Sequence, residues 1–137
     1  MNIAIVGATG LVGRKIIKLC EEFFDNGPDF QLFASKASEV KTLSINNKDV
    51  EIKELNIKNI EPCDIALFSA GGARSKEYAN EFVDKGAFVI DNSSTFRMDE
   101  DIPLVVYGIN ENTINENTKI IANPNCTTMA LSNGFKA

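Results

Sequence analysis

Four short apolar runs along the chain are rich in β-branched and aromatic residues, which is typical of strands buried on both faces of a parallel sheet. They span residues 3–6, 29–34, 64–69 and 87–91. Apolar residues recur at helical spacing in 11–25 and 74–85, and we expect a helix in each, the first closed by the stop signal Asn26-Gly27-Pro28. Strands that alternate with helices predict an α/β fold of the Rossmann type, with a doubly wound, mostly parallel sheet and helices on both faces.

A glycine-rich loop joins the first predicted strand to the first predicted helix. Gly7, Gly10 and Gly13 stand at the spacing G-x-x-G-x-x-G directly after the strand. Glycine permits the dihedral angles of a tight turn and lets the backbone approach a ligand closely. The start of the helix then offers free N–H groups and the positive end of its dipole to a pyrophosphate. We interpret the loop as a dinucleotide-binding site, the alternative being an ordinary strand-to-helix turn.

The residues after the second predicted strand indicate which dinucleotide is bound. NAD-binding domains of this type carry an acidic residue there, which hydrogen-bonds the ribose 2′-hydroxyl. This chain has Ser35, Lys36 and Ser38 instead, two hydroxyls and a cation that suit a 2′-phosphate. The pattern favours NADP over NAD, with a polar surface loop as the alternative. After the strand at 64–69, the small residues Ala70-Gly71-Gly72 leave room for the cofactor backbone.

Shorter segments complete the predicted organisation. Residues 42–46 and 50–55 flank a polar turn at 46–49 and predict a hairpin, which we interpret as an insertion rather than as part of the nucleotide-binding core. Short strands are expected at 104–107 and 119–122.

Composition limits the possible functions. At 137 residues, with 44% hydrophobic and 24% charged residues, the chain has the length and composition of one soluble globular domain. Its net charge of −5 argues against nonspecific nucleic-acid binding, and no apolar run approaches the roughly 20 residues that span a membrane. Three scattered cysteines, and a first strand that leaves no room for a signal peptide, lead us to expect a cytoplasmic protein. The sequence contains no histidine, and no metal site is expected.

A second chemical motif, Asn123-Pro124-Asn125-Cys126, follows the last predicted strand. Because Pro124 disfavours both a continued strand and a helix at the residue before it, we expect a helix to start around Cys126. The positive end of that helix would stabilise the Cys126 thiolate, and N–H groups of the same turn would donate to a developing oxyanion. The alternative is a small buried side chain, the usual fate of a free cysteine and the only one indicated for Cys20 and Cys63.

Four motifs occur in one order along the chain: Gly-Ala-Thr-Gly-Leu-Val-Gly at 7–13, Ser-Ala-Gly-Gly at 69–72, Val-Ile-Asp-Asn-Ser-Ser-Thr-Phe-Arg at 89–97 and Asn-Pro-Asn-Cys at 123–126. Together they closely resemble the N-terminal half of aspartate-semialdehyde dehydrogenases, and the resemblance covers essentially the whole chain. The last motif separates this sequence from the related N-acetyl-glutamyl-phosphate reductases, whose nucleophile lies in a Gly-Cys context.

The resemblance implies an enzyme that reduces L-aspartyl 4-phosphate with NADPH to L-aspartate 4-semialdehyde, a step toward lysine, threonine and methionine. By position, Cys126 matches the nucleophile that forms a thioester, Arg97 an arginine that binds the substrate phosphate, and Asn125 a residue that contacts substrate. Ser35 and Ser38 match a Ser-x-Arg-Ser site for the 2′-phosphate. The full set of expected cofactor-binding residues is Gly7, Thr9, Gly10, Leu11, Val12, Gly13, Ser35, Lys36, Ser38, Ser69, Ala70, Gly71 and Gly72.

The chain departs from the family pattern in three places. Ala37 stands where the family has an arginine, so Lys36 has to supply the charge or the NADP preference is weaker. Tyr107-Gly108 replaces the usual Pro-Glu, with no evident chemical consequence. The sequence ends at Ala137, whereas the family's second domain carries the catalytic histidine, the arginine for the substrate α-carboxylate and most of the dimer interface. We therefore expect residues 1–137 to form an NADP-binding domain, inactive alone, from an enzyme that forms homo-oligomers.

A competing interpretation is a nucleotide-binding module, or an atypical short-chain reductase, because Gly-Ala-Thr-Gly-x-x-Gly loops occur in that class too. Short-chain reductases use a Tyr-x-x-x-Lys acid–base pair. Neither Tyr78 nor Tyr107 is followed by a lysine four residues later, which disfavours the enzymatic form. A binding module has no need of an activated Cys126, so thiol reactivity distinguishes the two interpretations.

Overall fold

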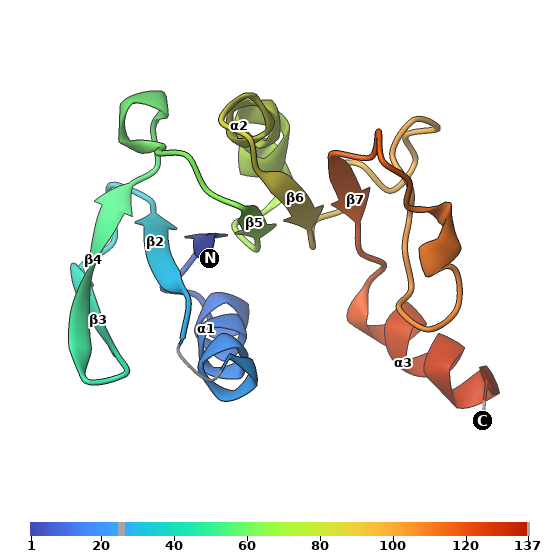
Figure 1. Ribbon diagram of the computed structural model, residues 1–137, viewed down its shortest axis with the longest axis horizontal. Coiled ribbons are helices and arrows are strands. Elements are labelled where there is room, and N and C mark those ends of the chain that lie inside the picture. The colour runs from blue at the N-terminus through green and yellow to red at the C-terminus, as the bar shows by residue number, and fades with distance from the viewer. Residues whose placement is uncertain (25–26, 137) are drawn as a thin grey trace.

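The computed structural model describes residues 1–24 and 27–136, and over these residues the chain forms a seven-stranded sheet flanked by helices (Figure 1). The strands are β1 (Asn2–Val6), β2 (Asp29–Ala34), β3 (Thr42–Ile45), β4 (Lys48–Glu54), β5 (Ile65–Phe68), β6 (Phe88–Asp91) and β7 (Ile120–Ala122). The helices are α1 (Leu11–Phe23), α2 (Gly72–Asp84) and α3 (Cys126–Lys136), and short 3₁₀ turns span Ile57–Asn59 and Glu111–Thr113. No helix in the described ranges is long and apolar enough to cross a membrane.

The strands lie in the order β3-β4-β2-β1-β5-β6-β7. All neighbours pair in parallel except β3 and β4, which are antiparallel. Without β3, this is the order 3-2-1-4-5-6 of a doubly wound Rossmann sheet. With α1 on one face and α2 on the other (Figure 1), the predicted α/β fold is confirmed.

The predicted hairpin belongs to this sheet. β4 pairs in parallel with β2, with Ile52 opposite Leu32. The interpretation of the hairpin as an insertion outside the core is therefore wrong, because β4 is the third strand of the Rossmann order and β3 adds an antiparallel edge. The physical reason is burial, since Ile45 and Ile52 pack in the same apolar cluster as Leu32 and Ile17 of α1.

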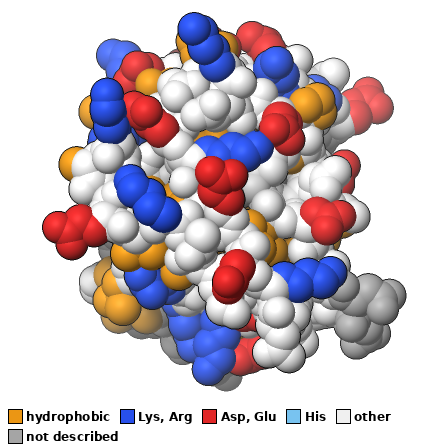
Figure 2. Space-filling view, turned by 90° about the vertical axis from the view of Figure 1, so that its left-hand side faces the viewer, with side chains coloured by type: hydrophobic (Ala, Val, Ile, Leu, Met, Phe, Trp, Pro, Cys, Tyr) orange, Lys and Arg blue, Asp and Glu red, His pale blue; other side chains and the backbone are white. Residues whose placement is uncertain are grey.

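The turn of the hairpin has two residues rather than the predicted four. Asn46 and Asn47 have φ angles of 49° and 60°, and Ile45 pairs directly with Lys48. Two central residues with positive φ are typical of a type I′ turn, which matches the twist of the strands and which asparagine tolerates. Charged side chains of both signs are interspersed over this edge of the molecule (Figure 2), which opposes pairing of β3 with another chain.

The helix boundaries differ from the prediction by a few residues. α1 ends at Phe23, and the predicted end at Asp25 and the stop signal at Asn26 lie outside the described residues. α2 begins at Gly72, two residues before the predicted start. α3 begins at Cys126, as predicted.

The region after α2 also differs from the prediction, because one of its two expected strands does not form. β7 confirms the strand predicted at 119–122, whereas Leu104 makes only an isolated bridge to Ala122 in place of the strand predicted at 104–107. The N–H of Val105 donates to the carbonyl of Ala122, and the chain then turns, with the N–H of Ile109 donating to the carbonyl of Val106. The turn leaves too little extended backbone for a strand.

The sheet separates two apolar clusters. Residues of β1 alternate between them, with Val6 in the cluster that α2 covers and Ile5 in the cluster that α1 covers. In the first cluster, the rings of Phe33 and Phe68 each make an edge-to-face contact with Phe82 of α2, with centroids 5.6 and 5.3 Å apart. Such contacts are the favoured geometry for aromatic pairs, so they fix α2 over the centre of the sheet.

The helix α1 approaches the end of β1 so closely that residue 13 has to be glycine. A Cβ atom at Gly13 would lie 2.2 Å from the carbonyl oxygen of Gly7 and 3.0 Å from Cα of Ala8. Gly7 itself has a φ of +97°, which residues with a side chain rarely adopt. Gly7 and Gly13 together set the distance between β1 and α1.

Replacing Gly13 with alanine is expected to lower the free energy of unfolding by at least about 2 kcal/mol, because backbone atoms of the preceding loop must move to admit the methyl group. Urea unfolding followed by circular dichroism measures the change. Gly134→Ala is the matched control: a Cβ there meets no atom within 4 Å, and alanine favours a helix by up to about 1 kcal/mol. A Gly13→Ala protein as stable as the wild type would contradict the close contact.

Candidate functional site

A cavity of about 260 Å³ opens at the carboxyl ends of β1, β2 and β5. In this class of sheet, ligands bind at that edge. The lining residues are Val6, Gly7, Thr9, Gly10, Phe33, Ala34, Ser35, Leu55, Ser69, Ala70 and Arg74. They include six of the residues predicted to bind the cofactor, so the fold brings together segments that are more than sixty residues apart in the sequence.

The loop after β1 is held in place by its own backbone. The N–H groups of Gly7 and Ala8 both donate to the carbonyl of Phe33 in β2, at 2.9 and 3.0 Å. The N–H of Gly10 donates to the carbonyl of Gly7 at 3.1 Å and closes the turn immediately before α1. The loop therefore places glycine backbone and the start of a helix beside the cavity, an arrangement that binds phosphate groups.

The other three cofactor-binding residues predicted in this segment, Leu11, Val12 and Gly13, do not line the cavity. Gly13 lies against the carbonyl of Gly7 and is buried, so it supports the loop rather than lining the cavity. Leu11 and Val12, in the first turn of α1, are 88% and 52% exposed. Their exposure shows that the core does not use these two side chains, which are accessible to a bound molecule.

A smaller depression of about 90 Å³ adjoins the cavity and shares Ala34 and Ser35 with it. The turn after β2 forms part of its wall, closed by a hydrogen bond of 2.9 Å from the N–H of Ser38 to the carbonyl of Ser35. Lys36 lines the depression from the same turn, Lys41 lines it from the segment before β3, and Lys53 lines it from β4. The three residues predicted to bind a 2′-phosphate, Ser35, Lys36 and Ser38, are thus gathered at one place.

The segment after β5 joins the cavity to α2. Ser69 and Ala70 line the cavity, and the N–H of Ser69 donates to the carbonyl of Val6 at 2.8 Å. Gly71 precedes α2 with a φ of +88°. Gly72 packs against Thr95, whose hydroxyl donates to the Gly72 carbonyl at 2.9 Å, and a Cβ at Gly72 would lie 2.7 Å from that hydroxyl oxygen. The two glycines thus permit the turn and the close approach of the loop at 92–97.

A buried carboxyl group supports the same loop, and sequence reasoning did not single it out. Asp91, at the end of β6, is fully buried and accepts hydrogen bonds from the hydroxyl of Ser75 in α2 at 2.6 Å and from the hydroxyl and N–H of Ser93 at 2.6 and 3.1 Å. A buried polar group has to be hydrogen-bonded to be tolerated. The signals in the sequence are its place in the motif at 89–97 and an acidic residue that closes an apolar strand shortly before two serines.

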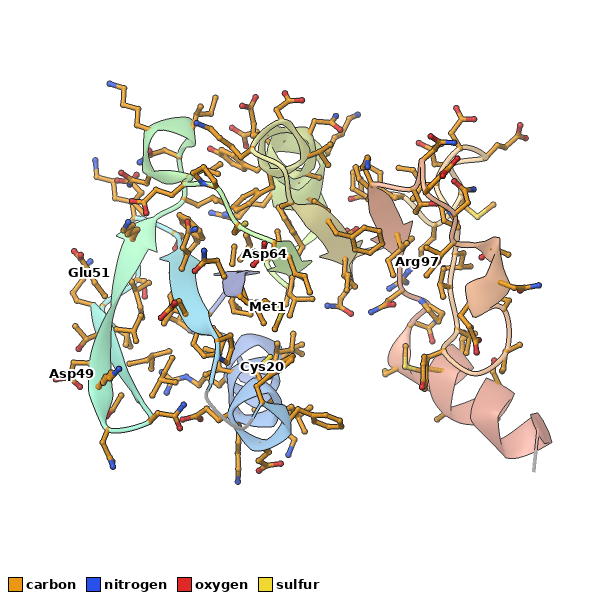
Figure 3. All side chains as sticks on the ribbon, in the orientation of Figure 1. Met1, Cys20, Asp49, Glu51, Asp64 and Arg97 are labelled. Atoms are coloured by element: carbon orange, nitrogen blue, oxygen red, sulfur yellow. The ribbon has the colours of Figure 1, made fainter. Side chains whose placement is uncertain are left out.

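Arg97 lies beside the chain that leads from β7 into α3 (Figure 3). Its Nε donates to the carbonyl of Asn123 at 2.8 Å, and its Nη2 donates to the carbonyl of Asn92 at 2.9 Å. The side chain of Asn123 donates to that of Asn92 at 2.8 Å, and the amide of Asn92 donates to the carbonyl of Phe68 at 3.0 Å. These bonds tie together the loops that follow β5, β6 and β7.

Cys126 is the first residue of α3, and its side chain is exposed. The alternative interpretation of this residue as a small buried side chain is therefore wrong. The side-chain oxygen of Asn125 accepts a hydrogen bond from the N–H of Thr128 at 2.8 Å, which is the bond of a helix N-cap. Asn125 thus fixes where the helix begins and places Cys126 in its first turn.

The other two cysteines lie in apolar surroundings. Cys63 is buried and Cys20 is partly buried. Burial raises the pKa of the Cys63 thiol to about 11 and also raises the pKa of the Cys20 thiol. Within the described ranges, no group of three or more metal-binding side chains is placed to hold a metal ion.

Arg74 is a residue of the site that sequence reasoning missed. It lies in the first turn of α2 and is the one charged side chain among the residues that line the larger cavity. The sequence placed it only within a predicted helix. Its position two residues after Gly71-Gly72 was the available signal, because the first turn of that helix faces the ligand edge.

A parallel sheet in this strand order, with a glycine loop between β1 and α1 and a cavity at the carboxyl ends of the central strands, defines a Rossmann-type dinucleotide-binding domain. The family described as "Semialdehyde dehydrogenase, NAD binding domain" matches residues 2–117. The chain belongs to this family.

Individual relatives agree with this assignment. An aspartate-semialdehyde dehydrogenase of Aquifex aeolicus is 48% identical over 133 residues, and one of Bacillus subtilis is 42% identical over 131 residues, covering 95% and 96% of this chain. Among solved structures, aspartate semialdehyde dehydrogenase II of Vibrio cholerae, in complex with ASA, is 42% identical over 95% of this chain, with a TM-score of 0.82.

The chain spans only part of the length of these relatives. It covers 39% of the Aquifex protein, 38% of the Bacillus protein and 43% of the Vibrio chain. The comparisons therefore concern the nucleotide-binding part of those proteins.

We expect Cys126 to react with iodoacetamide near neutral pH faster than Cys20 and Cys63. Cys126 is exposed, whereas burial keeps the other two thiols protonated until a higher pH. Peptide mass spectrometry after timed alkylation gives the three rates, and the difference is expected to narrow as the pH rises toward the pKa of the buried thiols. Modification of Cys63 or Cys20 before Cys126 would contradict the described environments.

Proposed function

We propose that this chain is the nucleotide-binding part of an aspartate-semialdehyde dehydrogenase and that it carries the enzyme's nucleophile, Cys126. One observation carries the proposal: the glycine-loop cavity after β1, β2 and β5 and the exposed thiol of Cys126 after β7 follow parallel strands of one sheet. The carboxyl ends of such strands share an edge, along which a dinucleotide lies in this class of fold. The names of the relatives support the substrate class.

NADP(H) is the cofactor that we propose for the cavity. The lining fits an anionic ligand rich in hydroxyl groups, because it combines the hydroxyls of Thr9 and Ser35, the backbone of Gly10 and the guanidinium of Arg74. The turn after β2 offers serines and a lysine rather than a carboxylate, which suits a 2′-phosphate. We propose that the cofactor contacts are the residues predicted from the sequence together with Arg74.

Cys126 is the proposed nucleophile. Its thiolate attacks the acyl carbon of aspartyl 4-phosphate, the carbon–sulfur bond forms, the bond from that carbon to the phosphate oxygen breaks, and inorganic phosphate leaves with the electron pair. The chemistry that bound NADPH supplies is hydride transfer to the resulting thioester carbonyl. The exposed position of Cys126 in the first turn of α3 gives substrate access, and N–H groups of that turn are suited to donate to the oxyanion.

Arg97 and Asn125 are the proposed substrate-binding residues. Arg97 uses two of the five N–H donors of a guanidinium to hold backbone carbonyls, and the others are proposed to bind the substrate phosphate. The oxygen of Asn125 caps α3, so its NH₂ group is the proposed contact to substrate.

The division of labour in the whole enzyme is also a proposal. Residues 1–137 bind the cofactor and carry the nucleophile at the C-terminal end of this unit. We propose that the acid–base histidine and the arginine for the substrate carboxylate lie in the part of the relatives' length that this chain does not span. We also propose that the whole enzyme is a homo-oligomer.

The chain is expected to bind NADP(H) more tightly than NAD(H), because the 2′-phosphate adds charge-assisted contacts at the turn after β2. Isothermal titration with each cofactor measures the two dissociation constants. Lys36→Glu is expected to weaken NADP binding about tenfold and to leave NAD binding unchanged. Equal affinities for the two cofactors, or tighter binding of NAD, would overturn the assignment of the 2′-phosphate site.

Assayed alone, the 137-residue chain is expected to show no steady-state formation of NADPH from aspartate semialdehyde, phosphate and NADP. In this direction a base must take the hydroxyl proton of the thiohemiacetal, and the chain contains no histidine. Loss of general base catalysis typically lowers the rate by about 10²–10⁴-fold, and loss of substrate orientation lowers it further. A steady-state rate that Cys126→Ala abolishes would show that this chain carries its own base.

A further inference from the structure

We propose that Lys41, in the segment before β3, binds the phosphate monoester on the 2′ position of the nucleotide ribose and supplies the positive charge that Ala37 does not. The inference rests on the proposed binding of NADP(H). It names a residue three positions beyond Ser38 that belongs to none of the predicted motifs and that lines the same depression.

Hydrogen bonds hold both the backbone and the side chain of Lys41. Its backbone carbonyl accepts a hydrogen bond of 2.8 Å from the N–H of Ile52, which ties the segment to β4. Its ammonium group donates to the carbonyl of Ser38 at 2.8 Å, which places the charge on the turn after β2. An ammonium group has three N–H donors and this bond uses one, so donors remain for an anion in the depression.

The other two lysines of the depression are less suited to the task. Lys53 forms an ion pair of 2.6 Å with Glu61, and the hydrogen bond and charge of Lys53 lower the pKa of that carboxyl group. Its charge is therefore largely compensated. Lys36 and Lys41 are both exposed, but within the described residues no hydrogen bond holds the ammonium group of Lys36, so that flexible side chain loses conformational entropy when it binds an anion. Lys41 is already held in place by a neutral partner, so its charge is not compensated and less entropy is lost.

The charges around the depression are mixed in sign. The carboxylate of Glu54 belongs to the same depression and opposes an anion. Over the neighbouring edge of the molecule, acidic and basic side chains are interspersed (Figure 2), and the whole chain carries a net charge of −5. Because the charges that Figure 2 shows on this side are mixed in sign, we expect selectivity for the phosphate to come from an individually placed ammonium group.

The test is the affinity of the 137-residue chain for adenosine 2′,5′-bisphosphate, for AMP, which has no 2′-phosphate, and for inorganic phosphate. Isothermal titration of wild type, Lys41→Gln and Lys41→Arg measures each affinity, and circular dichroism checks the fold. Lys48→Gln is the matched control, because Lys48 is an exposed lysine at the start of β4 that lines neither the cavity nor the depression.

Lys41→Gln is expected to weaken binding of adenosine 2′,5′-bisphosphate and NADP about tenfold and to change binding of AMP and NAD by less than twofold. Lys41→Arg is expected to retain most of the affinity, and Lys48→Gln all of it. Inorganic phosphate is expected to bind far more weakly than the bisphosphate, because the proposed site binds a phosphate that is attached to a nucleoside.

Several results would overturn the inference. One is that Lys41→Gln and Lys48→Gln bind the bisphosphate with equal affinity. Another is that Lys41→Gln loses as much affinity for AMP as for the bisphosphate. A third is that Lys41→Arg loses as much affinity for the bisphosphate as Lys41→Gln does. If the wild-type chain prefers NADP and Lys41→Gln still binds it normally, this inference alone fails. A wild-type chain that binds neither dinucleotide overturns the proposed function and this inference with it.

Discussion

The contact between α1 and the loop after β1 is the constraint on which the nucleotide cavity depends. The carbonyl of Gly7 occupies the space that a side chain at Gly13 would fill, so the helix backbone lies directly against the loop. The same loop is held to β2 by two hydrogen bonds to the carbonyl of Phe33. Strand, loop and helix therefore have one arrangement relative to each other, and the start of the helix faces the cavity. Without that close approach, the free N–H groups of α1 would not be beside a bound phosphate.

A polar network orders the other half of the ligand edge. Asn92 links the carbonyl at the end of β5 to the side chain of Asn123 after β7, and Arg97 holds the carbonyls of both asparagines. Since Asn123 is three residues before Cys126, this network sets the path of the chain into α3. The buried carboxylate of Asp91 also holds the loop at 92–97, through hydrogen bonds from the hydroxyls of Ser75 and Ser93. The Cys126 thiol thus follows loops that hydrogen bonds hold in place, which supports its proposed role as a nucleophile that meets substrate in one geometry.

Local signals explain which features were predictable. The strands β1, β5 and β6 are apolar runs whose residues are buried or, on one face of β5 and β6, partly buried, and the start of α3 follows from Pro124 and the capping Asn125. The place of β4 was not predictable, because a half-apolar strand has the same pattern in a separate hairpin and in a sheet. Only the pairing of Ile52 with Leu32 decides between them. Lys41 and Arg74 were missed for the same reason, since neither belongs to a motif and both reach the ligand edge through pairing and packing.

The sequence by itself determined the class of fold, the glycine loop, the family and the thiol at the start of a helix, because each depends on residues close together in the chain. Backbone dihedral preferences, capping and periodic burial act over a few residues and can be read without a structure. Only the tertiary structure decided which strand stands beside β2, which cations meet at the end of that strand, which backbone carbonyls hold Arg97 and which hydroxyl groups hold Asp91. Those contacts join residues that are 16 to 31 positions apart or come from separate elements, and they exist only because the parallel sheet brings the ends of its strands to one edge.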